Sequence, residues 1–195
     1  MILKIRQVGE PVLRQCSRPL TMEEIRSRYV QELIESMRET MRDAPGVGLA
    51  APQIGIPLQL VTIEDPAEAI QRLATEEAAL KGRRPVPFHV LINPVLTIPE
   101  GAAVEFFEGC LSLAGYTAIV PRAARVHVEG LNEHAEPVTI DATGWHARIL
   151  QHEIDHLNGV LYIDRMVARS FATLDNHLRF WKDKSIAEVT QALSA

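Results

Sequence analysis

Two histidines four residues apart flank a glutamate in the stretch Gln151 to Gly159, which reads Gln-His-Glu-Ile-Asp-His-Leu-Asn-Gly. On a helix, residues at positions i and i+4 project from the same face, with Cβ atoms about 5–6 Å apart. His152 and His156 could therefore bind one metal ion of the zinc type, and Glu153 would be placed to act on a water at that ion. The alternative is a pair of hydrogen-bonded core histidines.

A cysteine earlier in the chain could complete such a metal site. Cys110 lies in the stretch Glu-Gly-Cys-Leu-Ser, directly after an apolar segment that is typical of a strand. Three protein ligands leave a fourth tetrahedral position for water, which is the catalytic pattern rather than the structural one. The alternative for Cys110, and equally for Cys16, is an inert buried thiol. His146 is expected on the opposite side of the helix from His152, exposed to solvent.

The stretch from Gly46 to Gln53 reads Gly-Val-Gly-Leu-Ala-Ala-Pro-Gln and has almost no side-chain bulk. A ligand could lie close to the backbone of such a loop and pair with its N–H and C=O groups. Gln53 adds a neutral amide donor at its end. A plain connection between two elements is the alternative interpretation, since loops of Gly and Pro are common.

The helix that carries the two histidines has signals at both ends. Thr143 can cap its N-terminus, and Gly159 can close its C-terminus in a left-handed conformation. The spacing of its apolar and histidine residues predicts one buried stripe of Trp145, Ile149, His152 and His156.

The remaining elements are predicted from periodicity and turn signals. The N-terminal segment through Arg14 is expected to be an extended arm with a turn at Gly9-Glu10-Pro11. An amphipathic helix is expected over 23–43 and is ended by Pro45-Gly46. Strands are expected over 58–63, 89–97 and 103–107, with a hairpin of 124–131 and 138–141. Residues 66–87 read as a surface insertion. Residues 166–195 read as a helical tail whose Leu174, Leu178 and Trp181 would form a packing face.

Composition limits the class of protein. A chain of 195 residues with 47% apolar and 23% charged residues fits one soluble domain over 1–195. A net charge of −5 argues against a general nucleic-acid binder. No apolar run is long enough to cross a bilayer, and Met1 leads straight into strand-like sequence without a signal or transit peptide. We therefore expect a cytoplasmic protein without a membrane partner, in which a disulfide would be unusual.

Together, the three chemical stretches resemble those of the peptide deformylases in order and rough spacing. They are Gly46 to Gln53, Glu108 to Ser112, and Gln151 to His156, and the similarity extends over about residues 1 to 166. The Ser-x-x-Gly-Tyr form after Leu111 and the Gly144-Trp145 pair look more like the mitochondrial-type branch. The resemblance implies an α+β fold of short antiparallel sheets packed around a central metal-binding helix.

The resemblance also implies an activity and its residues. Cys110, His152 and His156 would bind one divalent metal ion, most often Fe(II), with Zn, Ni or Co as replacements. The substrate would be the N-formylmethionyl end of a newly made polypeptide, and formate would be released. Glu153 would act as general base, while the Gln53 amide and the Leu111 backbone N–H would hold the developing oxyanion. The backbone of Gly46 to Gly48 would pair with an extended peptide. Candidates for the substrate pocket are Val47, Gly48, Trp145 and Ile149.

The chain also departs from the family pattern. Many bacterial members carry an Arg shortly before a Val-Pro-Arg stretch, and this chain has Thr117 at that position. Arg122 is retained, and we expect it to pair with Glu108 as part of the scaffold. The tail is a further candidate for transient docking to the ribosome.

Two other functions stay open from the sequence. A general metallopeptidase shares the H-E-x-x-H motif but usually takes its third ligand from a Glu or His further downstream. A non-catalytic metal-binding module would normally have a fourth protein ligand and no need for Glu153.

Overall fold

Eight strands form two antiparallel sheets in the computed structural model, which describes residues 1–71, 73 and 75–194. The five-stranded sheet has the order β1-β2-β3-β6-β7, and the three-stranded sheet has the order β4-β5-β8. The first sheet consists of β1 (Gly48–Ala50), β2 (Leu60–Asp65), β3 (Val86–Thr97), β6 (Arg125–Leu131) and β7 (Pro137–Thr143). The second consists of β4 (Ala103–Glu108), β5 (Tyr116–Ala123) and β8 (Ala172–Thr173).

The larger sheet contains a deeply buried interior strand. Strand β2 is buried along almost its whole length, as expected for a central strand that is covered on both faces. It pairs with β1 on one side and with β3 on the other, in register Leu60↔Ile92. Strands β6 and β7 form the predicted hairpin, in which the side chain of Asn132 accepts hydrogen bonds from the backbone of His134 and Glu136. Strand β1 therefore lies at one edge of the sheet and β7 at the other.

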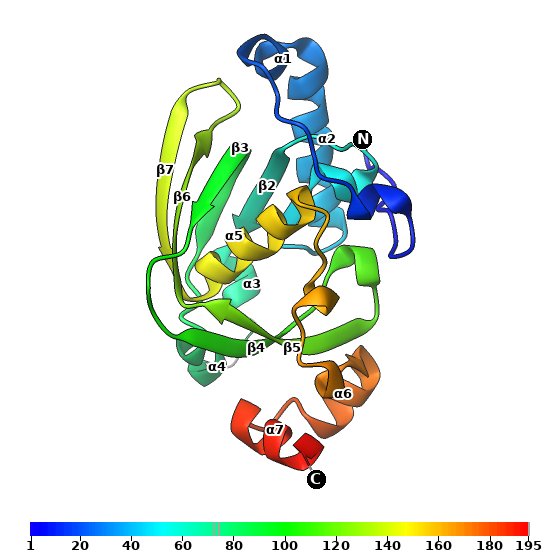
Figure 1. Ribbon diagram of the computed structural model, residues 1–195, viewed down its shortest axis with the longest axis vertical. Coiled ribbons are helices and arrows are strands. Elements are labelled where there is room, and N and C mark those ends of the chain that lie inside the picture. The colour runs from blue at the N-terminus through cyan, green and yellow to red at the C-terminus, as the bar shows by residue number, and fades with distance from the viewer. Residues whose placement is uncertain (72, 74, 195) are drawn as a thin grey trace.

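Seven α-helices occur among the described residues. Their bounds are α1 Met22–Arg26, α2 Arg28–Asp43, α3 Ala67–Ile70, α4 Thr75–Leu80, α5 Gly144–Leu157, α6 Leu174–Phe180 and α7 Ile186–Ser194. Helix α5 is central. It contacts strands of both sheets, and Figure 1 shows it crossing in front of the larger sheet. The α+β architecture of antiparallel sheets around this helix is as predicted.

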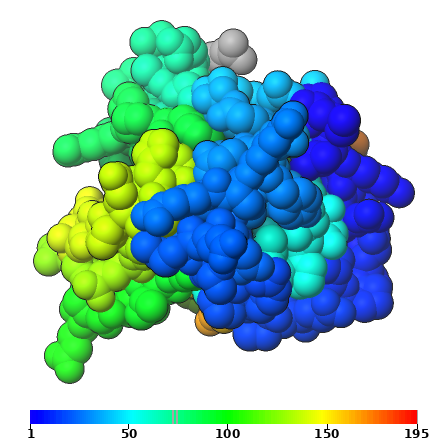
Figure 2. All heavy atoms as spheres, turned by 90° about the horizontal axis from the view of Figure 1, so that it is seen from above, coloured from blue at the N-terminus to red at the C-terminus, as the bar shows by residue number. Residues whose placement is uncertain are grey.

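Helix α2 closes one end of the molecule. The apolar stripe predicted for 23–43 is buried, with Val30, Leu33 and Met37 in a core cluster that also includes Leu60 and Ile92. The single predicted helix is wrong at one point, because the chain breaks at Ser27. Its hydroxyl caps α2, and its backbone is extended. Figure 2 shows the N-terminal residues in blue lying across this end, beside the yellow-green hairpin.

Several strands differ from the predictions. Strands β1, β5 and β8 were not predicted, and β2 begins at Leu60 rather than at residue 58. The turn before Pro11 is present, and Pro11–Arg14 then forms a 3₁₀ helix instead of extended chain. Each missed strand lacks a clear strand signal in its sequence. Strand β1 starts with a glycine, β5 contains Pro121, and β8 is only two residues long.

Two peripheral segments include α4, at the lower left of Figure 1, and α6 and α7, at its lower end. The range predicted as an insertion holds α3 and α4, and the range predicted as a tail holds β8, α6 and α7. Residues 72, 74 and 195 of these two ranges lie outside the described part of the chain. Leu174 and Leu178 are 46% and 53% exposed, so the predicted packing face of the tail is wrong for these two residues, whereas Trp181 is half-buried. Within the described residues, no helix is long and apolar enough to cross a membrane.

Candidate active site

Helix α5 holds the two histidines and the glutamate in fixed positions. Its N-cap residue is Thr143, as predicted, although the side chain makes no capping hydrogen bond. At the other end Gly159 has a φ of 70°, so the left-handed closure is confirmed. The imidazole rings of His152 and His156 lie side by side, with centroids 5.0 Å apart. Their predicted placement on one helix face is therefore present.

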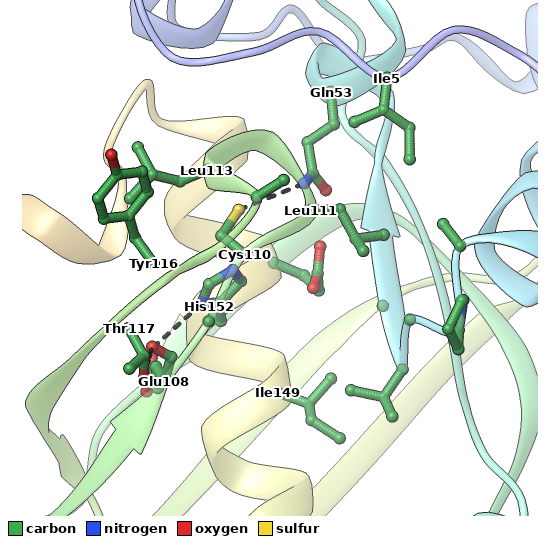
Figure 3. Close-up of a pocket in the computed structure, with 18 of the residues that line it drawn as sticks. Ile5, Gln53, Glu108, Cys110, Leu111, Leu113, Tyr116, Thr117, Ile149 and His152 are labelled. Carbon is green, nitrogen blue, oxygen red and sulfur yellow. Dashed lines mark hydrogen bonds and ion pairs between the residues drawn. The ribbon is translucent and has the colours of Figure 1, made fainter. Parts of the chain in front are cut away.

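Cys110 folds back onto these two rings. It follows the end of β4, and its Sγ lies 3.2 Å from His156 Nε2. The candidate ligand atoms of Cys110, His152 and His156 all lie within 4.8 Å of one another. No fourth His, Cys, Asp or Glu joins this group in the part of the chain that the structure describes. Figure 3 shows the sulfur and the His152 ring facing the same space. This group can hold a metal ion with a position left open for water.

Glu108 orients the ring of His152 by accepting a hydrogen bond from its Nδ1. Its carboxylate lies 3.0 Å from His152 Nδ1, so that ring nitrogen is the donor and Nε2 is left to face Cys110. The same carboxylate accepts hydrogen bonds from Arg122 Nε at 3.0 Å and from Arg148 Nη1 at 2.6 Å. The side chains of Arg122, Arg148 and His152 are 3%, 3% and 12% exposed. A carboxylate behind a histidine ligand fixes the ring tautomer and raises its basicity as a ligand.

This network continues beneath the helix. Arg122 also donates to Asp155, which pairs with Arg165 through two bonds of 2.7 Å. The expected pairing of Arg122 with Glu108 is therefore confirmed. Arg148 and His152 as further partners of Glu108 were missed. Nothing local in the sequence marks them, because the three chain segments meet only in the folded protein.

The network sets the charge of its members. Burial alone would raise the pKa of Glu108, but hydrogen bonds from His152 and Arg122 outweigh it and lower this pKa. Burial would lower the pKa of His152, whereas its hydrogen bonds to Cys110 and Glu108 raise it well above the usual value. The pKa of His156 is lowered, first by burial and then by the charge of His152. The Glu108 carboxylate thus favours a cation on the His152 side, and a metal ion at the ring would meet this preference as a proton does.

Glu153 is buried beside the loop that begins at Gly46. A methyl group added at Gly48 would overlap Glu153 Oε1 and lie 2.5 Å from its Cδ, so only glycine fits there. Burial raises the pKa of Glu153 to about 7, although the charges of His152 and Arg122 oppose the shift. Its Oε2 is buried and has no hydrogen-bond partner among the described residues. A carboxylate with this pKa can both accept and return a proton near neutral pH.

Gln53 and Leu111 lie next to the sulfur of Cys110. The Gln53 side chain is 1% exposed, and its Oε1 accepts from the backbone N–H of Ala50 at 2.8 Å. This bond turns its Nε2 toward Ser112 Oγ at 3.2 Å and Cys110 Sγ at 3.6 Å. The contact with the sulfur is the dashed line from Gln53 in Figure 3. Leu111 directly follows Cys110, and its carbonyl accepts from Gln7 Nε2 at 3.0 Å. The amide and the loop are therefore both held next to the candidate metal group.

These groups open into one cavity of about 640 Å³. All four residues predicted for the substrate pocket line it, namely Val47, Gly48, Trp145 and Ile149. The lining also includes residues that were not predicted, among them Ile5, Arg83, Leu113, Tyr116, Arg148 and Leu174. Their positions depend on contacts between distant segments, so no local pattern could have indicated them. The volume is in the range that encloses a drug-sized ligand.

Part of the range predicted as an insertion reaches this cavity. The Arg83 guanidinium is held by Asp65 through bonds of 2.7 and 2.8 Å, and it lies 5.6 Å from the centre of the Trp145 ring. The chain at Lys81 and Gly82 packs closely on Gly144, at the start of α5. The insertion therefore covers one end of the helix.

This packing explains a wrong prediction. His146 is half-buried rather than exposed, and its ring contacts that of His89 with centroids 5.5 Å apart. Burial, with repulsion from His89, lowers the pKa of His146 to about 4.

Comparisons with known proteins agree with this geometry. The family model described as polypeptide deformylase matches residues 2–171. The chloroplastic peptide deformylase 1A of Solanum lycopersicum is 48% identical over 172 residues, which cover 88% of this chain and 62% of that protein. The human mitochondrial peptide deformylase is 40% identical over 168 residues, covering 86% of this chain and 69% of that protein. The chain thus spans less than two thirds of the length of the tomato relative.

Solved structures show the same likeness. A class I type b peptide deformylase from Acinetobacter baumannii, determined with bound Met-Ala-Ser, superposes with a TM-score of 0.75 at 30% identity. The match covers 85% of this chain and 99% of that one. Since the family match runs through the loop at Gly46, the cysteine and the histidine helix, the chain belongs to the polypeptide deformylase family.

Proposed function

We propose that this chain removes the N-formyl group from the N-terminal formyl-methionine of newly synthesised polypeptides and releases formate. The observation that carries the proposal is the meeting of Cys110, His152 and His156 in one group, at a cavity that Cys110, His152 and Glu153 line. Family membership supports the same reaction, since the polypeptide deformylases are metal-dependent hydrolases of this kind.

The donor set fits one divalent metal ion. One sulfur and two imidazole nitrogens suit Fe(II), Zn, Ni and Co, and we propose Fe(II) as the native ion, with the others as replacements. The contact between Glu108 and His152 Nδ1 supports binding through Nε2. When bound, such an ion lowers the pKa of a water and stabilises negative charge on a carbonyl oxygen. Metal analysis of anaerobically purified protein tests the identity of the ion.

Three residues of this chain act on the reacting groups. Glu153 accepts the proton of the attacking water and passes it to the nitrogen of the leaving amine, which its pKa of about 7 favours. The Gln53 side-chain N–H and the Leu111 backbone N–H donate to the developing oxyanion. Each such donor stabilises the transition state by about 2.7–4 kcal/mol in a dry site.

The substrate binds in extended form along the edge strand β1. This strand pairs only with β2 among the described strands, so its other edge is available to a peptide backbone at Gly48. Val47, Trp145 and Ile149 provide apolar surface for the methionine side chain. The Met-Ala-Ser bound to the Acinetobacter baumannii enzyme is consistent with a peptide ligand of this kind.

The wider organisation is also part of the proposal. We propose that 1–195 forms one catalytic domain, to which 66–87 and 166–195 are peripheral additions. Helix α5 supports this view because it contacts both sheets. A cytoplasmic location and transient contact of the tail with the ribosome stay predictions.

Formate release tests the function directly. We expect release from formyl-Met-Ala, with no hydrolysis of acetyl-Met-Ala or of internal peptide bonds. A general metallopeptidase would instead cleave the internal bonds, and a non-catalytic module would cleave none of them.

Glu153→Ala tests the role of the general base. We expect it to lower kcat by about 10²–10⁴-fold with metal still bound. Unchanged turnover by a metal-loaded variant would contradict the mechanism. Gln53→Ala should lower kcat with metal retained, whereas Cys110→Ser should mainly weaken metal binding.

A further inference from the structure

The N-terminal arm passes along the wall of the cavity. Ile5 and Gln7 both belong to the cavity lining, and Figure 3 shows Ile5 beside Gln53. Between them, the backbone N–H of Arg6 donates to the Gln53 carbonyl at 2.7 Å. The arm therefore holds the backbone of the residue whose side-chain amide is the first proposed oxyanion donor.

The same arm holds the turn that carries the second proposed donor. The side chain of Gln7 donates through Nε2 to the Leu111 carbonyl at 3.0 Å. The backbone N–H of Val8 donates to the next carbonyl, that of Ser112, at 2.8 Å. Two consecutive carbonyls of the turn are thus bound from the arm, and one of these bonds comes from a side chain that can be replaced without changing the backbone.

The turn itself is short. It is a 3₁₀ helix of three residues, Leu111–Leu113, in which the Leu113 N–H donates to the Cys110 carbonyl at 3.0 Å. Glycines lie close on both sides of it, and Gly115 has a left-handed φ of 83°. A single helical turn is marginal by itself, because few hydrogen bonds are gained for the residues that it fixes. The position of the Leu111 N–H therefore depends on contacts from outside the turn.

The two proposed donors must also be set relative to each other. Gln53 Nε2 lies 3.2 Å from Ser112 Oγ and 3.6 Å from Cys110 Sγ, so the two loops meet at the sulfur. A donor stabilises an oxyanion only when it lies about 2.7–3.1 Å from the position that the oxygen takes in the transition state. A small shift of either loop would therefore slow the reaction while leaving substrate binding in place.

We propose that Gln7 is a positioning residue, which fixes the Leu111 backbone N–H relative to the Gln53 amide by joining the arm to the turn. This inference rests on the proposed function, in which those two groups hold the developing oxyanion. Gln7 acts through Leu111 and not on the reacting atoms. Because the Gln7 side chain is exposed, its substitution should leave the rest of the fold intact.

Gln7→Met tests the bond, because methionine has a similar length and no N–H to donate. With formyl-Met-Ala as substrate, we expect kcat to fall by about tenfold. This is less than the roughly 10²–10³-fold loss that follows removal of a whole oxyanion donor. KM and metal content should stay unchanged, because the affected contact is made only in the transition state. Gln7→Lys, which places a donor at this position again, should recover most of kcat.

Hydrogen exchange of the metal-loaded protein gives a readout that does not depend on turnover. The backbone amides of residues 110–113 should exchange about 3–10-fold faster in Gln7→Met than in the unchanged protein, since one hydrogen bond that opposes local opening is lost. Mass spectrometry of peptic fragments measures the rates. Equal rates in the two proteins would contradict the inference.

Gln31→Met is the matched control. Gln31 Nε2 also joins two separate segments, through the carbonyls of Ile25 and Glu133 at 2.8 Å each, but Gln31 is not part of the cavity lining. Its substitution should leave both kcat and the exchange of residues 110–113 unchanged. An unchanged kcat in Gln7→Met, an equal fall in Gln31→Met, or no recovery in Gln7→Lys would each overturn the inference. If the unchanged protein released no formate, the proposed function would be wrong, and this inference with it.

Discussion

Helices α5 and α6 each place residues against the same pocket, but they are held in different ways. Ten of the 14 residues of α5 are buried, and its Arg148 and Asp155 side chains pair with Glu108 and Arg122 of the smaller sheet. None of the seven residues of α6 is buried. Helix α6 is attached through β8 and through a contact between the rings of His177 and Phe107, whose centroids are 4.2 Å apart.

The difference corresponds to what each helix would do. Groups that act on reacting atoms must be held to a fraction of an ångström, and burial in a packed interior provides that. Helix α6 contributes Leu174 to the lining of the cavity, and a lining contact does not need this precision. The comparison therefore predicts large effects of substitution around α5 and small effects on α6.

The largest effect is expected at Glu108, where the network meets. Glu108→Gln removes the charge shared by Arg122, Arg148 and His152. We expect a loss of about 3–5 kcal/mol in the free energy of unfolding, because buried guanidinium groups lose their partner. Metal affinity should fall by about 10–100-fold. Denaturant titration and a metal competition assay measure the two quantities.

The control for this prediction is Glu32→Gln in α2. Glu32 forms an exposed ion pair with Arg28 at 2.6 Å, and such pairs contribute about 0.3–0.5 kcal/mol. Equal losses in the free energy of unfolding of the two variants would mean that the buried network around α5 stabilises the protein no more than an exposed ion pair does.

The next effect concerns the contact between Gly48 and Glu153. Gly48→Ala places a methyl group where the carboxylate lies, so Glu153 must move. We expect kcat for formyl-Met-Ala to fall by about 100-fold with metal content unchanged, as a misplacement of about 1 Å can cause. Gly101→Ala is the control, because nothing lies within 4 Å of the added group. Normal turnover in Gly48→Ala would show that Glu153 has room to adjust.

A smaller effect is expected from pH at the start of α5. The pKa of His146 is about 4 in the folded protein and about 6.5 in the unfolded chain, so between these values only the unfolded chain binds the proton. Stability should therefore fall as pH falls from about 6.5 to 4. Because the ring is partly exposed, we expect about 1–2 kcal/mol rather than the full value of the shift.

Thermal unfolding across this pH range, compared with His146→Gln, measures that contribution. The variant should lose less stability on acidification than the unchanged protein. Parallel curves for the two proteins would refute the assignment to His146.

The smallest effect is expected on α6. Leu178→Ser should change the free energy of unfolding by no more than about 0.5 kcal/mol, because the side chain is already half exposed. Leu150→Ala in α5, where the side chain is fully buried, should reduce it by about 2–5 kcal/mol. Chemical denaturation measures both. A loss above 1 kcal/mol in Leu178→Ser would indicate that α6 is packed more tightly than its exposure suggests.

The sequence predicted α5 and its three chemical residues well because their signals are local. Spacing along one helix places His152 and His156, and Gly159 marks the end. Cys110 was predicted through its motif, and its contact with His156 Nε2 agrees with that prediction. The loop at Gly46 was predicted to lie open for a ligand, but Gly48 also makes room for Glu153.

What the sequence did not predict depends on contacts between distant segments. His146 was expected to be exposed, and the turn at Gly82 covers its end of the helix. Leu178 was expected to pack and does not, since an apolar spacing shows a stripe but not whether a partner exists. Leu174 reaches the pocket only because β8 pairs with β5.

The convergence on Glu108 has a consequence for how the protein folds. Its partners on β5 and α5 lie 14, 40 and 44 positions away in the chain. If α5 docked before the smaller sheet closed, the Arg148 guanidinium would enter the interior without the Glu108 carboxylate as its counter-charge. Partial assembly is therefore unfavourable, and helix and sheet should come together in a single cooperative event. An incompletely folded chain would then not bring Cys110 together with His152 and His156, so it would lack the complete metal-binding group.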